Sequence, residues 1–221
     1  MKRLVPTLLL IVFLFSVGHY AAAEDLSTMK DDELLDLRLQ INNELANRLT
    51  TAEVPDGSTI ADLFPDPVFA RYVRDQIGAF STKDLADPSL LEGIREVNFL
   101  SHDDGLTSLE GIQYLPNLEG LWLYWQDGLK EIPDAIGDLI YLKTISLTRC
   151  EIAALPDSIT NLVNLETLRI DQTNIAELPE DIGNLTSLTY LDISETKITE
   201  LPKSIYNLKL SKFLRNGLDL D

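Results

Sequence analysis

The chain has few of the residues on which covalent and metal chemistry depend. Its 221 residues include one cysteine, Cys150, and two histidines, His19 and His102. A single cysteine excludes an internal disulfide framework, and one thiol with two imidazoles is too few for a typical zinc site. The same shortage leaves no basis for a Ser-His-Asp or Cys-His catalytic arrangement, and there is no glycine-rich phosphate loop. We therefore expect no enzymatic activity and no cofactor.

Basic residues are also scarce. The chain has 18 Lys and Arg residues against 36 Asp and Glu residues, which gives a formal net charge of -18. Proteins that bind nucleic acids draw most of their affinity from clustered Lys and Arg, so this balance argues against a nucleic-acid partner. Hydrophobic residues nevertheless make up 45% of the chain, which is enough for a packed core. The sequence thus has few reactive groups and few positive charges, but it has enough apolar residues to form a folded domain.

The first 23 residues have the layout of a secretory signal peptide. Lys2 and Arg3 precede an apolar stretch, residues 8–17, which leads to the alanine triplet 21–23. A basic start, an apolar middle and an A-x-A end are typical of a signal that is removed on export. The apolar stretch is short for a membrane-spanning helix, so a retained anchor is the weaker interpretation. The prediction for residues 1–23 is a cleaved signal, and a mature protein without a transmembrane anchor that is secreted, periplasmic or at the cell envelope.

Three further segments lead up to the second half of the chain. Residues 24–50 carry leucine and isoleucine at three- and four-residue spacing, which predicts one amphipathic helix, with a coiled-coil dimer as the alternative. Residues 51–63 contain a Pro-Asp-Gly-Ser run and are expected to form a linker. Residues 64–93 are expected to form a helical N-terminal cap. In this cap, Asp66 is the predicted N-cap residue and Pro67 the first residue of a helix.

From residue 94 onward the sequence repeats itself. Three units, which start at Leu142, Leu165 and Leu188, share the pattern L-x-x-L-x-L at a step of 23 residues; two longer units precede them, and a partial unit starts at Ser211. A period in the twenties with this pattern is the signature of a leucine-rich repeat. The predicted fold class is therefore α/β. Residues 94–221 are expected to form a leucine-rich-repeat solenoid, a curved parallel sheet of about five to six strands, with the helical cap and amphipathic helix before it.

Two stretches of the sequence resemble a known family. The helical cap and first repeats of internalin-like leucine-rich-repeat proteins of bacteria are similar to the run FPDPVFARYVRDQIG, which starts at Phe64, and to the following GIREVNFLSHDDGLTSLEGIQYLPNLEGLWL. The later LPxxIxxLxxL units resemble the 23-residue repeats common in the wider superfamily. The resemblance covers the chain from Phe64 to its end. It implies an extracellular protein-binding surface, which some relatives use for adhesion.

One position in each repeat is expected to point inward just after the strand. It is occupied by His102, Gln126, Cys150, Thr173 and Thr196. All of these except Cys150 can make an inward hydrogen bond to the backbone, and cysteine suits a dry position as a small buried group. We therefore interpret both Cys150 and His102 as structural residues.

The concave face of the predicted sheet carries the candidate site. Side chains between and just after the buried leucines point out of the sheet, and both tryptophans of the chain fall there on one strand. Large exposed aromatic side chains without a role in folding are typical of binding hot spots. Trp122, Tyr124, Trp125 and Leu100 are predicted as the centre of the site. The full set of predicted ligand-binding residues is Leu100, Trp122, Tyr124, Trp125, Arg149, Arg169, Asp171 and Tyr190.

Two structural alternatives concern this face. The cap or the amphipathic helix could cover the aromatic residues and bury them, because a contiguous exposed apolar patch is unusual without a partner. Arg169, Asp192 and Arg215 also fall in one column with alternating charges on successive strands. That column favours a ladder of charges paired within the protein over a site for a charged ligand.

The function predicted from this face is that of a secreted, non-enzymatic module that binds a protein ligand, in adhesion or in a host- or cell-surface interaction. A carbohydrate-binding module that uses the Trp and Tyr strip is one alternative, and an inhibitor of a secreted enzyme is another. Stacks of repeats need a polar end cap, and only a short sequence follows Ser211. Self-association through the C-terminal repeat edge is therefore also predicted.

Overall fold

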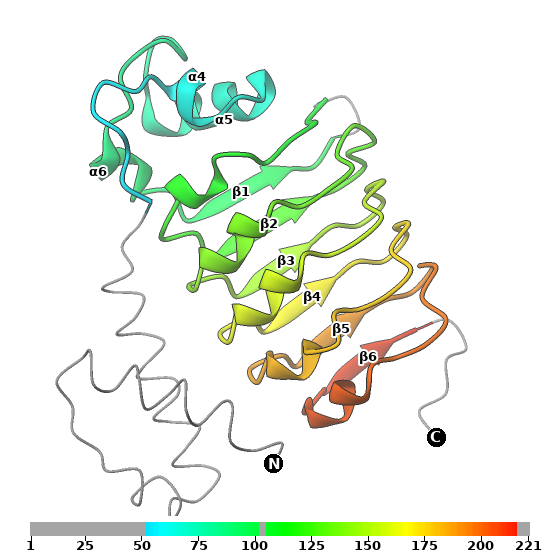
Figure 1. Cartoon of the computed structure of the whole chain (residues 1–221). Coiled ribbons are helices and arrows are strands. Elements are labelled where there is room, and N and C mark those ends of the chain that lie inside the picture. Colours follow the sequence, from blue (N-terminus) through cyan, green and yellow to red (C-terminus); the bar gives the residue numbers. More distant parts are fainter. Residues whose placement is uncertain (1–51, 102–104, 216–221) are drawn as a thin grey trace, which may run out of the picture. The chain divides into compact units, whose positions relative to one another are not determined.

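The structure is a computed structural model that describes residues 52–101 and 105–215 (Figure 1). The predicted signal peptide, the predicted amphipathic helix of residues 24–50 and His102 lie outside the described residues. Within the part of the chain that the structure describes, no helix is both long and apolar enough to cross a membrane.

Each repeat contributes one short strand to a single parallel sheet. The six strands lie side by side in sequence order as β1 (Glu96–Phe99), β2 (Gly120–Leu123), β3 (Thr144–Ser146), β4 (Thr167–Arg169), β5 (Tyr190–Asp192) and β6 (Lys212–Leu214). The return segments between them contain the 3₁₀ helices η1 (Ile112–Tyr114), η2 (Asp134–Asp138), η3 (Asp157–Asn161), η4 (Ile182–Asn184) and η5 (Lys203–Asn207). Figure 1 shows the strands stacked along one side of the repeats and the return segments along the other. The predicted leucine-rich-repeat solenoid is confirmed.

Leucine and isoleucine side chains on the inward side of the strands form a continuous core. Leu121, Ile145, Leu168 and Leu191 occupy one register position on β2 to β5, and all four are buried. Burying one such side chain contributes about 1.5–3 kcal/mol, and a single repeat cannot cover these residues by itself. Stability therefore comes from stacking, and the stacking fixes the column in which each concave side chain lies.

The inward position after each strand carries the predicted structural residues. Gln126 Nε2 donates to two backbone carbonyl groups at 2.9 and 2.7 Å. The hydroxyls of Thr173 and Thr196 each donate, at 2.7 Å, to the carbonyl three residues earlier. Cys150 is buried, and its Sγ lies 3.5 Å from the carbonyl oxygen of Leu123. The prediction of a ladder of inward side chains is confirmed at these four positions.

A helical cap precedes the first strand. It consists of α4 (Ile60–Leu63), α5 (Pro67–Ile77) and α6 (Pro88–Leu91). Asp66 caps α5 and Pro67 is its first residue, as predicted. The predicted linker, residues 51–63, is wrong in its last part because α4 forms there. The side chains of Thr59 and Asp62 cap each other's backbone N–H groups, which starts a helical turn at this point.

Asp66 also ties the cap to the first repeat. One of its carboxylate oxygens accepts hydrogen bonds from the N–H groups of Val68 and Phe69 at 2.8 and 3.0 Å. The other accepts from the N–H and hydroxyl of Thr107 at 2.8 and 2.6 Å, and from the N–H of Ser108 at 3.0 Å. Burial raises the pKa of Asp66, but the hydrogen bonds outweigh burial and the pKa lies below its ordinary value. The charged carboxylate therefore holds α5 against the loop that follows β1.

The cap closes the first edge of the sheet with one tyrosine. The hydroxyl of Tyr72 donates to the carbonyl oxygen of Glu96 at 3.1 Å and accepts from the N–H of Asn98 at 3.2 Å. The rings of Phe69 and Tyr72 pack against Phe99, with centroid distances of 6.3 and 4.9 Å. Backbone groups on an edge strand otherwise invite pairing with another chain, so Tyr72 replaces a neighbouring strand here.

The last strand differs from the predicted register by one residue. The predicted column of Arg169, Asp192 and Arg215 requires Leu214 in the buried strand position, with Phe213 and Arg215 on the concave face. In the structure Phe213 pairs with Leu191 and packs against the core, while Leu214 pairs with Asp192. The phenyl ring removes more apolar area from water in the inward position than leucine would. The predicted concave position of Phe213 is therefore wrong, and self-association through this edge stays a prediction.

Candidate functional site

The four residues predicted as the centre of the site gather in one hollow on the concave face. Leu100 is 57% exposed, Trp125 is 40% exposed, and Trp122 and Tyr124 are partly exposed. Together with Glu96 and Asn98 they line an open hollow of about 540 Å³ over β1 and β2, which we call the aromatic hollow. The described part of the cap closes the edge of β1 and leaves this hollow open. The alternative in which the cap buries the aromatic residues is wrong for the described residues.

A glycine makes room for one of the two indoles. Gly120 is two residues before Trp122 on β2, so both residues belong to the same face of the sheet. A Cβ atom added to Gly120 would lie 1.9 and 2.0 Å from the ring atoms Cη2 and Cζ3 of Trp122. The indole therefore occupies the space that any larger residue at position 120 would need. In register with Gly120, the next strand carries Thr144.

Trp125 is held by a repeated backbone conformation. Trp125, Arg149, Gln172 and Glu195 have φ values of 54°, 57°, 57° and 55°, which is the left-handed region. Each non-glycine residue there costs on the order of 1–2 kcal/mol. Backbone hydrogen bonds to the following repeat offset this cost. The N–H of Trp125 donates to the carbonyl oxygen of Thr148 at 3.2 Å, and the N–H of Gln172 donates to that of Ser194 at 2.9 Å. These four side chains form a row at one edge of the concave face.

Side-chain contacts run along this row. The guanidinium carbon of Arg149 lies 5.3 Å from the ring centroid of Trp125, in the geometry of a cation–π interaction. Arg149 Nε also donates to Oε1 of Gln172, and Gln172 Nε2 donates to Glu195 Oε1 at 3.0 Å. The predicted ligand residue Arg149 therefore borders the aromatic hollow, and its side chain already contacts the repeats on both sides of its own.

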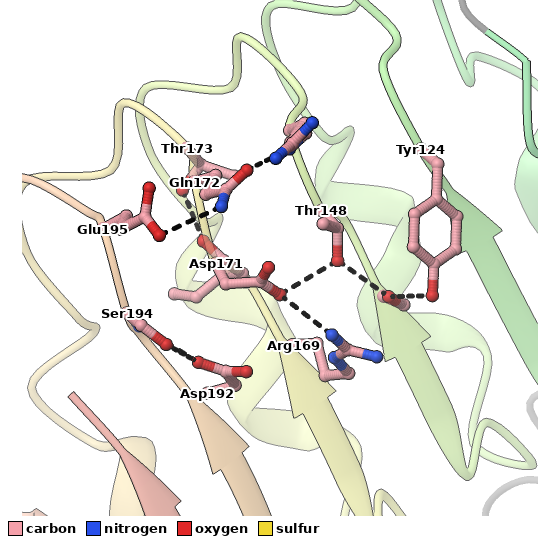
Figure 2. A network of polar contacts seen from close by, with 12 residues as sticks. Tyr124, Thr148, Arg169, Asp171, Gln172, Thr173, Asp192, Ser194 and Glu195 are labelled. Carbon is pink, nitrogen blue, oxygen red and sulfur yellow. Dashed lines mark hydrogen bonds and ion pairs between the residues drawn. The ribbon is translucent and has the colours of Figure 1, made fainter.

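A polar network occupies the concave face beyond the hollow (Figure 2). Ser146 Oγ lies 3.2 Å from the hydroxyl of Tyr124 and 3.3 Å from that of Thr148. Thr148 donates to Asp171 Oδ1 at 2.9 Å, and Arg169 lies 3.6 Å from the same oxygen. Arg169 Nε is buried without a hydrogen-bond partner among the described residues. Apart from that nitrogen, the polar side chains of this region bond one another across β2, β3 and β4.

The predicted column of alternating charges forms only in part, because Arg169 and Asp192 are in register but do not pair with each other. Arg169 pairs with Asp171, two residues further along the chain after the end of β4, and Asp192 accepts a hydrogen bond from the N–H of Ser194 at 3.1 Å. Leu214 lies next to Asp192 in place of Arg215, because of the shifted register of β6. The prediction of charges paired within the protein is therefore correct for Arg169, but the partners it named are wrong.

Tyr190 lies apart from the aromatic hollow, three strands away on β5. The ammonium of Lys212 sits 4.9 Å from the centroid of its ring. The structure thus brings together Leu100, Trp122, Tyr124 and Trp125, places Arg149 at their border, and assigns Arg169, Asp171 and Tyr190 to other contacts. Two lining residues, Glu96 and Asn98, and the supporting Gly120 were not predicted as part of the site, although register places them on the same face. A glycine in a strand position that threonine or tyrosine occupies in the next three repeats was the available signal.

The described residues offer little for chemistry or metal binding. Among them, no group of three or more His, Cys, Asp or Glu side chains is placed to hold a metal ion. Burial raises the pKa of the Cys150 thiol to about 11, so the thiol is neutral and shielded at physiological pH. The arrangement is suited to holding a ligand against aromatic rings.

Comparisons with known proteins agree with this architecture. Residues 159–217 match a family model described as a leucine-rich repeat region. Internalin H of Listeria monocytogenes is 29% identical over 90 residues, 41% of this chain, and internalin C of the same species is 31% identical over 85 residues, 38% of this chain. The chain spans 16% and 28% of those two relatives. A solved internalin structure from the same species has a TM-score of 0.53 at 24% identity, covering 77% of this chain and 56% of that one.

Proposed function

We propose that this chain, which is an internalin-like leucine-rich-repeat protein, is an exported, non-enzymatic module that binds a protein ligand at the aromatic hollow of its concave face. One observation carries the proposal: Leu100, Trp122, Tyr124 and Trp125 line one open hollow on a rigid sheet. Export rests on the signal-like pattern of residues 1–23 and on the resemblance to internalins.

The energetics of such a surface favour a binding role. Trp and Tyr bury a large area with few rotatable bonds, and truncation of one such hot-spot residue typically costs 2 kcal/mol or more of binding free energy. Contiguous apolar surface on a soluble protein commonly marks a site of interaction. The sheet fixes the backbone under the hollow, so little conformational entropy is lost there on binding.

The lining of the hollow favours a protein over a carbohydrate. Sugars present many hydroxyl groups, and a site for them needs several convergent polar side chains. Glu96 and Asn98 are the only polar side chains of the lining besides the hydroxyl of Tyr124 and the indole N–H groups, whereas Leu100 offers only apolar surface. The three aromatic rings keep a carbohydrate ligand as the second candidate. Inhibition of a secreted enzyme has no corresponding observation in its favour.

The test compares the wild-type protein with a Trp122→Ala/Trp125→Ala variant and with a matched Thr144→Ala/Thr167→Ala control from the same face. Proteins from a cell-surface extract are captured on all three, and each candidate is then purified and titrated. We expect at least one purified protein whose affinity falls by about 30-fold or more in the tryptophan variant and by less than about threefold in the control. Equal affinity for all three immobilised proteins would contradict the proposal. Selective loss of binding on a glycan array would assign the hollow to carbohydrate.

A further inference from the structure

The aromatic hollow contains one residue that is charged at neutral pH, and that charge is negative. Glu96 is exposed on β1, and Asn98 Nδ2 approaches its carboxylate at 3.4 Å. No cationic side chain lies within ion-pair distance of Glu96 among residues 52–101 and 105–215. The carboxylate therefore borders the hollow without an ion pair from the described chain.

Three cations next to strands β1 and β3, Arg95, Lys143 and Arg149, are engaged elsewhere. Arg95 donates to the carbonyl of Asn117 at 3.1 Å and lies 4.0 Å from Glu119. Lys143 pairs with the same Glu119 at 2.8 Å. On the other side of the hollow, Arg149 is held by Gln172 and by the ring of Trp125. None of these side chains is positioned to neutralise Glu96.

Aromatic rings on this face already bind cations of the chain itself. Arg149 stacks on Trp125 with 5.3 Å to the ring centroid, and Lys212 stacks on Tyr190 with 4.9 Å. The rings of Trp122 and Tyr124 have no such partner within the described part of the chain. A cation over an aromatic ring gains about 0.5–1 kcal/mol when exposed and about 2 kcal/mol or more when desolvated. A cation from a ligand would find two rings without a stacked cation and a carboxylate without an ion pair in the same hollow.

We propose that the aromatic hollow binds a lysine or arginine side chain of a basic segment of the protein ligand. The cationic head lies against Trp122 and Tyr124 and pairs with Glu96, while the aliphatic stem packs on Leu100. The volume of about 540 Å³ is large enough for one such side chain and its flanking backbone. The formal net charge of -18 attracts a basic segment over a longer range. This assignment rests on the proposed function and names the partner chemistry of the same site.

The test uses two small probes that differ in charge and hardly at all in shape. N-acetyl-arginine amide and its neutral isostere N-acetyl-citrulline amide are titrated in the millimolar range into the full-length protein at low ionic strength. The two indole N–H cross-peaks of a nitrogen–proton correlation spectrum report binding, and Trp122→Phe assigns them. We expect saturable shifts of the Trp122 peak with the arginine probe and affinity for citrulline about fivefold weaker. Added salt should reduce the arginine affinity and leave that for citrulline unchanged.

Two variants locate the charge that is responsible. Glu96→Gln should weaken the arginine probe by about three- to fivefold and leave citrulline unchanged, whereas Glu131→Gln, an exposed carboxylate outside the hollow, should change neither. Equal affinity for the two probes, no saturable shift with either, or no effect of Glu96→Gln would each overturn the assignment. The assignment can fail while the proposed function stands, because the tryptophan variant would still lose the protein ligand. If the proposed function fails, the tryptophan variant binds the captured proteins as well as the wild type does, and this outcome does not depend on the arginine titration.

Discussion

The concave face has two parts that the same repeat builds in different ways. Over β1 and β2, large aromatic side chains line an open hollow and leave much of their surface in water. Over β3 and β4, short polar side chains contact each other across neighbouring strands, as from Thr148 to Asp171 at 2.9 Å. The backbone register is the same in both parts. The difference lies in the side chains alone.

This contrast identifies which part of a repeat surface is available to a ligand. Neighbouring parallel strands lie about 4.8 Å apart, so Ser, Thr, Asp and Arg in adjacent columns can reach each other and satisfy their hydrogen bonds. A ligand that bound the polar part would first have to break those bonds. The aromatic rings can be covered by a ligand without breaking a hydrogen bond of the strands, and covering them buries their apolar surface. The aromatic hollow is therefore the part of the face that benefits from a partner.

The largest expected effect on stability comes from a substitution that detaches the helical cap from the first repeat. Asp66→Ala removes the acceptor of five hydrogen bonds, two that cap α5 and three that join it to the first repeat, so the free energy of unfolding should fall by about 3–5 kcal/mol. Amide exchange should accelerate first in β1 and last in β4. The control Asp62→Ala, which removes the exposed capping carboxylate of α4, should lower the free energy of unfolding much less. Uniform loss of protection in all strands would contradict a separate role for the cap.

Asp66 also predicts how the free energy of unfolding depends on pH. The pKa of Asp66 in the folded protein is lowered from its ordinary value of 3.8, so its charged form stabilises the fold at any pH above that value. That contribution is lost as the pH falls below 3.8 and through the folded pKa. Chemical unfolding across the acidic range should therefore give a flatter stability curve for Asp66→Ala than for the wild type. Parallel curves would contradict this assignment of the charge.

Substitutions in the polar part are expected to lower the stability of the protein without changing its affinity for the ligand. Asp171→Ala leaves Arg169 and Thr148 without their shared partner, and the free energy of unfolding should fall by about 2 kcal/mol. Asp171→Asn keeps an acceptor for Thr148 and should cost about half as much. Both variants should bind the protein ligand within about twofold of the wild type. A loss of ligand at unchanged stability would move the site to the polar part.

A substitution at Gly120 can alter the hollow without removing any of the side chains that line it. Gly120→Ala forces the indole off its place, because the added carbon would overlap its ring, and ligand affinity should fall by about tenfold. The free energy of unfolding should change by less than about 1 kcal/mol, since the ring lies on the open face and can shift. Thr144→Ala, in register on β3, is the control and should leave affinity unchanged. Tryptophan emission should shift only in the glycine variant.

The smallest effect is expected at the border between the two parts. Arg149→Ala removes the cation that stacks on Trp125, and this interaction is worth about 0.5–1 kcal/mol at an exposed position. Ligand affinity should fall by about two- to fivefold, and the fluorescence of Trp125 should change in a Trp122→Phe background. Arg149→Lys should restore part of the affinity. An unchanged spectrum would contradict a stacked guanidinium in solution.

The repeats were predictable because they depend on local rules. A fixed step of leucines sets the strands, and Asp66 before Pro67 sets the start of α5. The last strand was misplaced because two apolar residues, Phe213 and Leu214, are adjacent, and the pattern cannot decide which of them enters the core. Packing favours the larger of the two side chains, the phenyl ring of Phe213.

The site was predictable only in part for a different reason. Register alone placed Leu100, Trp122, Tyr124 and Trp125 on one face, and the structure brings them into one hollow. Register did not reveal the partners of charged side chains, since Arg169 pairs with Asp171, just after its own strand, instead of across to Asp192. That choice depends on rotamers, which a one-dimensional pattern does not contain. The role of Gly120 likewise depends on where the ring of Trp122 lies.

The free energy of unfolding of the Trp122→Ala/Trp125→Ala variant tests the central claim most directly. If the indoles form an open surface with no role in folding, chemical denaturation should give a value within about 1–2 kcal/mol of the wild type. The variant would then lose its ligand while remaining folded. A loss of more than about 5 kcal/mol, the cost expected when buried tryptophans are removed from a core, would contradict the claim.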